Sequence, residues 1–374
     1  MLRMNQFSKT LLLVPPLLAL STANISCRKE NLVKPASSHI DVDSGAPNAS
    51  DFSSETTLSS NYTSVIKPNY DAGTAGSFSG VDGINISYRV VKAIGSVKGS
   101  VMILPGRTEP HQKYAEVIWD LNRQGYTVFI MSHRGQGESG RMLSDPQIGY
   151  VKKFRDYVTD AQTFIGIFKS QAQGKKFLLA HSMGGAIGAY LAKENAGDFD
   201  AFVLSSPMIE INTAPYPSDI AWDIVTYTYG IGDGEKYAIG KGPFNENEDF
   251  NNFAQNDVTH SKPRWQNKMD MFIQNKSLQL GGPSNQWVST SVKATLEIRR
   301  FAGEVQAPIL MLQASADDIV ITSSQTSFCS SASKCQLSTF PGAYHEILME
   351  AESISGSPTR GEAMAKIVRY FNHF

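Results

Sequence analysis

The sequence has no surplus of charge of either sign and no long run of one charge. Its 374 residues include 34 Lys and Arg against 35 Asp and Glu, which gives a formal net charge of -1. A nucleic-acid-binding surface needs concentrated basic side chains, because counterion release at the phosphates drives that binding. The composition therefore predicts that nucleic acid is not a partner.

The chain also lacks the spacings typical of metal and nucleotide sites. No group of His, Cys and carboxylate residues has the spacing of a zinc site, and no glycine-rich loop is suited to phosphate. The Gly135-x-Gly137 turn follows a predicted strand, but it has no third glycine and no downstream pattern of a dinucleotide site. We therefore expect no metal and no cofactor.

Cysteine is scarce, with three residues in the whole chain. Cys329 and Cys335 lie six positions apart, which is close enough for a disulfide across a short loop. Such bonds persist only in oxidising compartments, so a bridge here would agree with export. The alternative is two free buried thiols, because unpaired cysteine is among the residue types most often buried.

No apolar run at the N-terminus is long enough for a stable membrane span. The apolar run from Leu11 to Leu20 contains Pro15-Pro16, which would break a membrane helix. Charged residues flank the polar start of the chain, and small residues follow the run. This order is typical of a secretory signal peptide, which we place at residues 1–26. The protein is then expected in the periplasm or on an outer surface.

The third cysteine, Cys27, directly follows the predicted signal peptide. It resembles the lipidated cysteine at the cleavage point of a bacterial lipoprotein, although Asn24 stands where that pattern has an aliphatic residue. Cleavage after Ala23 by an ordinary signal peptidase is the alternative. Lipidation of Cys27 would anchor the protein at a membrane surface.

Residues 27–68 are rich in Ser, Asn, Asp, Thr and Pro and contain few aliphatic residues. Such a segment buries too little apolar surface to order itself. We therefore predict a disordered linker, which spaces the folded part of the chain from its anchor or from a membrane surface.

Beyond residue 68, strand-like apolar runs alternate with amphipathic helical stretches. Most of the strand-like runs are continuously apolar, which is typical of a parallel sheet covered by helices on both faces. Strands are predicted at 84–90, 100–104, 126–131, 177–180, 201–205, 308–312 and 336–340. Helices are predicted at 114–124, 154–168, 186–195 and 362–371. The pattern predicts an α/β domain in two parts, at 69–207 and 293–374.

The alternation stops between residues 208 and 292, where no strand is evident. We interpret this stretch as a lid inserted at the end of a strand. Its large side chains either line an acyl-binding pocket or form the core of the lid itself. They are Trp222, Tyr227, Tyr229, Phe250, Phe253, Trp265, Met269, Met271 and Phe272.

The strongest local motif is Ala180-His181-Ser182-Met183-Gly184-Gly185. It lies where a predicted buried strand ends and a helix of small residues begins. A nucleophile elbow needs small residues beside its Ser, because strand and helix approach closely at a strained turn. Ser182 is therefore the candidate nucleophile, and the alternative is a tight turn with an incidental Ser.

A Ser hydroxyl is a weak nucleophile until a base removes its proton. Of the seven His residues, His345 is placed on a loop after the last predicted strand, where such a base is expected. The carboxylate that orients this base should follow the preceding strand, where Asp317 and Asp318 compete.

The oxyanion that forms during acyl transfer needs two backbone N–H groups directed at it. The residue after the nucleophile, Met183, supplies one candidate. The second candidate is the N–H of Arg107, in the Leu104-Pro105-Gly106-Arg107 loop that follows an early predicted strand. The alternative for Gly106 is a plain turn at the end of that strand.

Four stretches of the sequence match a known family: 105–109, 132–141, 149–151 with positions 154, 156–158 and 160, and 342–348. On these stretches the chain, from about residue 80 onward, resembles the lysophospholipase L2 and monoacylglycerol lipase group of α/β hydrolases. The resemblance implies an α/β-hydrolase fold, a mostly parallel sheet flanked by helices with an inserted lid. It also selects Asp317 by its small-x-x-Asp-x-x-Val spacing, and the order Ser182, Asp317, His345 is that of α/β hydrolases. Pro105 departs from the group, where many relatives have His.

This resemblance implies a serine carboxylic ester hydrolase that acts on lipid-like substrates through an acyl-enzyme. Lysophospholipase is the first expectation, with monoacylglycerol lipase or a broad esterase second, and a peptidase on the same scaffold is a further alternative. The Arg107 side chain would bind a phosphate head group or form an ion pair with Glu109 or Asp145. The rival from another class is a non-catalytic surface lipoprotein that keeps the fold.

Overall fold

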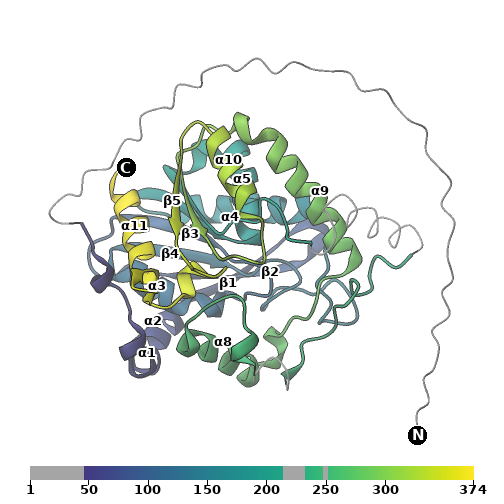
Figure 1. Ribbon diagram of the computed structural model, residues 1–374, viewed down its shortest axis with the longest axis horizontal. Helices are drawn as coiled ribbons and strands as arrows, with labels where there is room; N and C mark the ends of the chain where they lie inside the picture. Colours follow the sequence, from purple (N-terminus) through teal and green to yellow (C-terminus); the bar gives the residue numbers. More distant parts are fainter. Residues whose placement is uncertain (1–45, 214–231, 247–251) are drawn as a thin grey trace, which may run out of the picture. The chain divides into compact units, whose positions relative to one another are not determined.

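The computed structural model describes residues 46–213, 232–246 and 252–374 (Figure 1). No helix in these residues is long and apolar enough to cross a membrane. The predicted signal peptide and the predicted lipidation site lie outside the described residues, and so do four side chains assigned to the lid: Trp222, Tyr227, Tyr229 and Phe250.

An eight-stranded sheet forms the centre of the fold, in the order β1-β2-β4-β3-β5-β6-β7-β8. The strands β3 to β8 run parallel, whereas β2 is antiparallel to both of its neighbours. This arrangement confirms the predicted fold class. The strands are β1 (Thr74–Ser79), β2 (Asn85–Val91), β3 (Gly99–Leu104), β4 (Tyr126–Met131), β5 (Lys175–His181), β6 (Ala201–Ser205), β7 (Ile309–Ala314) and β8 (Cys335–Phe340).

Helices cover both faces of the sheet (Figure 1). Successive side chains of a strand point to opposite faces, so Met102 and Leu104 of β3 enter one apolar cluster and Val101 and Ile103 the other. The first face carries α4 (Phe154–Gln171), α5 (Met183–Glu194), α9 (Asn285–Phe301) and α10 (Thr322–Ser331). The second face carries α1 (Glu55–Asn61), α2 (Lys67–Asp71), α3 (Ala115–Arg123) and α11 (Arg360–Asn372).

The apolar spacing of α4 explains why this helix lies on the sheet. Phe154, Val158, Ala161, Ile165 and Phe168 are all buried, and alternating steps of four and three residues keep them on one helical face. Asp156 in the first turn accepts a hydrogen bond from the N–H of the residue before the helix, 3.1 Å away, which fixes its start.

The predicted linker is wrong for residues 46–68. These residues form η1 (Ala49–Asp51), α1, η2 (Tyr62–Ile66) and the start of α2. Phe52, Leu58 and Ile66 are buried in the apolar cluster of the second face. The polar composition misled the prediction, because a few well-spaced apolar residues suffice to hold a segment whose remaining side chains face solvent.

A buried ion pair also holds this N-terminal segment. Arg360 of α11 and Asp120 of α3 are fully buried and pair at 2.8 Å. Asp120 accepts hydrogen bonds from the N–H of Ser53 at 2.9 Å and from its hydroxyl at 2.7 Å. Arg360 donates to the carbonyl of Ser53 at 3.0 Å. The segment thereby satisfies charges that α3 and α11 would otherwise bury without enough partners.

The insertion between β6 and β7 is shorter than predicted. The boundary at residue 292 falls inside α9, whose buried Trp287, Ala294 and Ile298 belong to the apolar cluster of the first face. This helix packs on α4 and α5 and so belongs to the layer that covers the sheet. Its mixture of polar and apolar residues was assigned to the insertion because no strand accompanied it.

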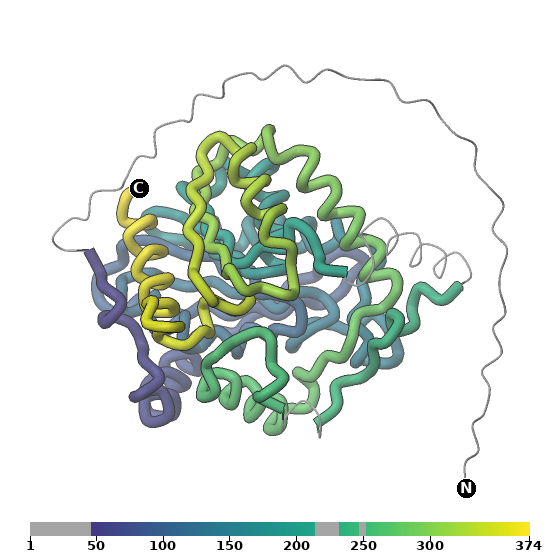
Figure 2. Tube along the Cα trace, viewed as in Figure 1, coloured from purple at the N-terminus to yellow at the C-terminus, as the bar shows by residue number. Residues whose placement is uncertain are grey.

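The described part of the insertion has a small core of its own. Trp265, Met269, Phe272 and Leu278 are buried together, with Phe253 packed against them. These side chains therefore follow the second of the two sequence interpretations. They belong mainly to α8 (Lys262–Gln274), which lies against α1 and is seen beside the N-terminal helices in Figure 2.

The position of Leu58 gives a test of the folded N-terminal segment. This side chain is 0% exposed, so we expect Leu58→Ala to lower the free energy of unfolding by about 2–5 kcal/mol. Urea unfolding at pH 7 measures the change. Leu337→Ala on β8, where the side chain is 38% exposed, should change it by less than about 0.5 kcal/mol. Equal, small effects of both substitutions would mean that residues 46–68 do not pack on the domain.

Candidate active site

The turn between β5 and α5 is strained at Ser182. This residue has φ 53° and ψ -117°, a conformation that a residue with a Cβ adopts only when its surroundings impose it. Gly184 and Gly185 make the turn possible. A Cβ on Gly184 would overlap the carbonyl oxygens of Leu104 and Pro105, and a Cβ on Gly185 would overlap Pro207.

Three loops at the carboxyl ends of parallel strands bring Ser182, Asp317 and His345 together. Nε2 of His345 lies 2.7 Å from Oγ of Ser182, and Nδ1 lies 2.7 Å from Oδ2 of Asp317. All three side chains are buried. Oδ1 of Asp317 accepts hydrogen bonds from the N–H groups of Ile319 at 2.9 Å and Val320 at 3.1 Å, which fix the carboxylate.

Of the two competing carboxylates, the structure brings Asp317 and not Asp318 to the imidazole. Asp318 is exposed, and its carbonyl accepts a hydrogen bond from Asn212 at 2.9 Å. An ionised carboxylate only accepts hydrogen bonds, so the Nδ1 of His345 carries the proton. Nε2 is then free to accept the proton of the Ser182 hydroxyl, as a general base requires.

The loop after β3 holds the other oxyanion candidate. Gly106 donates its N–H to Oε2 of Glu109 at 2.5 Å, and its carbonyl accepts from Gln136 at 2.8 Å. The next N–H in the chain is that of Arg107. Met183 is the first residue of α5, so its N–H has no acceptor within the helix. Both residues line the same cavity as Ser182, which is the placement that an oxyanion hole needs.

The side chain of Arg107 contacts the inserted segment and not the carboxylates considered from the sequence. It donates from Nη2 to the carbonyl of Gly281 at 2.5 Å and lies over the ring of Trp287, with 5.3 Å to its centroid. Among the described residues no carboxylate forms an ion pair with it. Burial lowers the pKa of Arg107 to about 10, so it remains a cation at neutral pH.

A buried chain of charges connects the oxyanion loop to the loop of the imidazole. The ammonium of Lys113 lies 2.5 Å from Glu109 and 2.7 Å from Glu346, the residue after His345. Tyr114 donates to Glu109 at 2.7 Å. Burial raises the pKa of Glu109, but Lys113, His181 and the hydrogen bond from Tyr114 together outweigh burial, so the pKa of Glu109 lies well below its usual range.

The sequence prediction missed Glu109, Lys113 and Glu346 as functional residues. The spacing of four between Glu109 and Lys113, and the position of Glu346 directly after His345, were the available signals. Neither signal shows that Lys113 reaches both carboxylates, because the residues it joins are far apart in the chain. Lys113 thus holds the oxyanion loop and the imidazole loop in a fixed position relative to each other.

A second buried carboxylate, Glu350, holds the imidazole loop from another side. It accepts from the N–H of Tyr344 at 2.9 Å and from the N–H of His260 at 2.5 Å. The N–H of Glu346 donates to the carbonyl of Val258 at 2.8 Å. The inserted segment before α8 is therefore hydrogen-bonded to the loop on which the imidazole depends.

Two further histidines make structural contacts around the nucleophile turn. His181 bonds through Nδ1 to the carbonyl of Ser205 at 3.1 Å, and His133 bonds through Nε2 to the carbonyl of Pro105 at 3.0 Å. Burial lowers the pKa of each imidazole to about 4. Both rings are therefore neutral at physiological pH, and they support the loops around Ser182 without carrying charge.

A cavity of about 840 Å³ opens beside Ser182 and His345, within the size range of small-molecule sites. One part of its lining is polar and consists of Glu109, His181, Lys268 and Glu346. Another part is apolar and belongs to the cluster of the first face or packs against it: Met208, Ile211, Trp287, Val288, Ile319 and Val320. The cavity can therefore accommodate a molecule with one polar and one apolar part.

Away from this cavity, Cys329 and Cys335 form a disulfide, with their Cα atoms 5.1 Å apart. The bond joins the end of α10 to the start of β8. No group of three or more His, Cys, Asp or Glu residues that could hold a metal ion occurs in the part of the chain that the structure describes.

The buried imidazoles of His133 and His181 predict a loss of stability in mild acid. Unfolding restores a pKa near 6.5, so the unfolded chain binds more protons between about pH 6.5 and 4. Above this window the two neutral imidazoles do not lower the free energy of unfolding. As the pH falls through the window, the free energy of unfolding should decrease by about 1 kcal/mol per pH unit for each histidine. Urea unfolding from pH 7 to 4.5 measures the slope. His133→Asn should reduce the slope, and an unchanged slope would contradict this account.

Comparison with known proteins agrees with this geometry. The family model Hydrolase_4, described as serine aminopeptidase S33, matches residues 95–352. Lysophospholipase L2 of Escherichia coli K12 is 35% identical over 309 residues, which cover 79% of this chain and 86% of that protein. A probable lysophospholipase L2 of Haemophilus influenzae is 29% identical over 304 residues, covering 79% of this chain and 90% of that protein.

Solved structures show the same fold at low sequence identity. A carboxyl esterase from Bacillus coagulans superposes with a TM-score of 0.63 at 17% identity, covering 81% of this chain and 98% of the esterase. A monoglyceride lipase from Saccharomyces cerevisiae gives a TM-score of 0.61 at 14% identity, covering 81% and 96%. The family match spans most of the described residues, and the nucleophile turn and its imidazole lie inside it. The chain therefore belongs to the serine aminopeptidase S33 family of α/β hydrolases, and it is a serine hydrolase of the carboxylic ester class.

Proposed function

We propose that this protein is a lysophospholipase that works through an acyl-enzyme. The observation that carries the proposal is the hydrogen-bonded series from Ser182 through His345 to Asp317, with both distances at 2.7 Å. This series opens onto a cavity that has a polar and an apolar part. A lysophospholipid has the same division, a charged head and one acyl chain.

In the first half of the reaction, Ser182 attacks the ester carbonyl while His345 takes its proton. Asp317 holds the imidazole in the required tautomer and stabilises the imidazolium. The N–H groups of Arg107 and Met183 stabilise the oxyanion. His345 then returns the proton to the oxygen of the leaving alcohol, and the acyl group remains on Ser182.

In the second half, a water molecule enters where the alcohol has left. His345 removes a proton from this water, whose oxygen attacks the acyl carbonyl. The second oxyanion uses the same two N–H groups. Its collapse releases the fatty acid and returns the proton from the imidazole to Ser182.

The substrate proposal rests on the relatives together with the cavity. The lysophospholipases L2 are similar over most of their own length, and the apolar lining is suited to an acyl chain. Monoacylglycerol lipase is the second candidate, because monoglyceride lipases share the fold and part of the sequence. The two activities differ in whether the leaving alcohol carries a phosphate. Arg107, a cation without a carboxylate partner among the described residues, is one candidate ligand for that phosphate.

We also propose that the protein is exported and acts at a membrane surface, as a lipoprotein anchored through Cys27 or as an ordinary secreted enzyme. The signal-like N-terminus supports export, and the Cys329–Cys335 disulfide agrees with an oxidising compartment. The mass of the mature N-terminus distinguishes the two forms, since only the anchored form carries acyl chains on Cys27.

The proposed mechanism predicts how the rate depends on Ser182 and Asp317. We expect Ser182→Ala to lower kcat/KM for a short p-nitrophenyl ester by about 10⁴-fold or more. Asp317→Asn should lower it by about 10³- to 10⁴-fold, because the imidazole then takes the wrong tautomer. Asp318→Asn is the matched control and should change it by less than about twofold. Steady-state hydrolysis of p-nitrophenyl butyrate measures all three, and full activity in Ser182→Ala would exclude the acyl-enzyme.

A substrate panel tests the class of substrate. We expect kcat/KM for a 1-acyl lysophospholipid to exceed that for a monoacylglycerol of the same chain and for an aminoacyl p-nitroanilide. The reason is that the cavity lining includes the cationic side chains of Arg107, Lys241 and Lys268, which suit a phosphate. Release of fatty acid and of nitroaniline measures the three rates. Higher activity on the monoacylglycerol would favour the second candidate, and activity confined to the anilide would make the enzyme a peptidase.

A further inference from the structure

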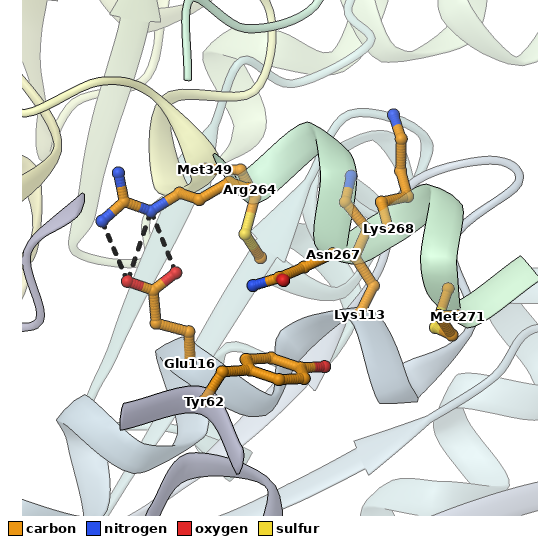
Figure 3. A pocket seen from close by; sticks show the side chains of 8 residues that line it. All are labelled: Tyr62, Lys113, Glu116, Arg264, Asn267, Lys268, Met271 and Met349. Atoms are coloured by element: carbon orange, nitrogen blue, oxygen red, sulfur yellow. Dashed lines mark hydrogen bonds and ion pairs between the residues drawn. The ribbon is translucent and has the colours of Figure 1, made fainter. Parts of the chain in front are cut away.

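Lys268 of α8 lies between two cavities. It lines the large cavity that contains Ser182 and His345, and it also lines a small cavity of about 20 Å³ whose lining includes Tyr62 and Glu116. Figure 3 shows the small cavity, where the ammonium groups of Lys268 and Lys113 point to the same side, away from Tyr62. The Lys268 side chain is 15% exposed.

The ionic partner of Lys268 is already bound to another cation. Its ammonium lies 3.5 Å from Oε1 of Glu346, whereas Lys113 lies 2.7 Å from the same oxygen. An ammonium has three N–H donors, and this long contact is the one hydrogen bond that Lys268 makes among the described residues. Most of its donor capacity is therefore left for a ligand.

The other cations around the small cavity are paired at short range. Arg264 lies 2.9 Å from Glu116 and 3.0 Å from Glu352, and Figure 3 shows its bonds to Glu116. Lys113 lies between two carboxylates. Burial lowers the pKa of Lys268, although Glu346 opposes this effect, so burial of this ammonium is not fully compensated by the protein. An anion in the large cavity would supply the missing compensation.

The position of Lys268 also indicates which part of a substrate it meets. The imidazolium of His345 gives its proton to the leaving alcohol, so that alcohol lies beside the imidazole. Glu346 follows His345 in the chain and is the residue that Lys268 contacts. In a lysophospholipid the leaving alcohol is a glycerol phosphate, whose phosphate is a few bonds from the ester oxygen. A flexible lysine stem spans such a distance.

We propose that Lys268 forms an anion subsite that binds the phosphate of the leaving alcohol. This inference rests on the proposed lysophospholipase function and names the residue that distinguishes its substrate from a monoacylglycerol. The bond is a charge-assisted hydrogen bond from the ammonium to a phosphate oxygen, which is stronger than a bond to a neutral hydroxyl. The subsite lies on the side of the cavity next to Glu346, apart from the contact of Arg107 with Gly281.

The main experiment compares two substrates that differ only in the phosphate, 1-oleoyl lysophosphatidate and 1-oleoylglycerol. We expect Lys268→Met to lower the ratio of their kcat/KM values by about 10- to 100-fold, as for the loss of a hydrogen bond between charged groups. Lys268→Arg should keep the ratio within a few-fold. Lys262→Met is the matched control, because Lys262 is an exposed lysine of the same helix. Thermal unfolding verifies that each variant is folded, and Lys268→Gln replaces the Met variant if that one is not.

A second measurement does not need a lysophospholipid to be a substrate. Glycerol 3-phosphate should inhibit the hydrolysis of p-nitrophenyl butyrate by competing for the cavity. Its inhibition constant should rise about tenfold or more in Lys268→Met and stay unchanged in Lys262→Met. If the wild type does not hydrolyse lysophosphatidate but this constant rises, the subsite is supported and the proposed function fails.

The opposite outcomes overturn the subsite. If Lys268→Met lowers the rates on both oleoyl substrates by equal factors and leaves the inhibition constant unchanged, Lys268 only positions Glu346. The proposed function would then still stand on the wild-type rates. If Arg107→Met lowers the substrate ratio and Lys268→Met does not, the phosphate is bound on the Arg107 side and the proposal is wrong.

Discussion

The strained turn at Ser182 is the constraint on which the site depends. Its φ of 53° costs about 1–3 kcal/mol relative to a relaxed backbone. The turn persists because its neighbours hold it. Ser182 donates its N–H to the carbonyl of Ser205 at 3.1 Å and accepts at its own carbonyl from Met208 at 2.9 Å. Gly184 lets the start of α5 approach the backbone of the oxyanion loop. One turn thus fixes the hydroxyl, one oxyanion donor and the distance to the other.

This turn is not sufficient, because the imidazole comes from a distant part of the chain. Glu350 and the bridge of Lys113 to Glu346 hold the loop that carries it. A buried ion pair contributes little net stability, since desolvation offsets most of the Coulomb attraction, but removing one partner is strongly destabilising. The charged cluster of Glu109, Lys113 and Glu346 therefore serves mainly to fix the geometry of the site. It couples the oxyanion loop, through Glu109, to the imidazole loop, so that the two keep a common register.

The sequence contained most of what was needed to predict the reacting groups. Ser182 is predicted by the small-residue turn that follows an apolar strand, and His345 by the loop that follows the last strand. Both signals lie in a few neighbouring residues. The choice of Asp317 depended on the residue spacing of the family, because Asp318 is also a carboxylate that follows the same strand. The bonds of Ile319 and Val320 to Asp317 depend on the conformation of the turn, which composition does not encode.

The residues that the sequence did not predict are those whose roles depend on distant partners. Lys113 becomes informative only when Glu109 and Glu346 are known to meet it. The segment at 46–68 resembles a linker because its burial rests on three or four apolar side chains and on one ion pair supplied by α3 and α11. The strand β1 was missed for a similar reason, since its short polar sequence is ordered by pairing with β2.

The same contacts decide what the region around α8 can do. Moving this helix away from the domain would expose the ion pair of Arg264 and Glu116. It would also break two hydrogen bonds between the inserted segment and the imidazole loop, from His260 to Glu350 and from Glu346 to Val258. Each loss leaves a buried charge or polar group without its partner, which costs several kcal/mol in sum. In the structure these contacts hold α8 against the domain, where its Lys268 lines the cavity. Lys268 is carried by this wall, so only its flexible side chain, and not the helix, has to adjust to meet an anion in the cavity.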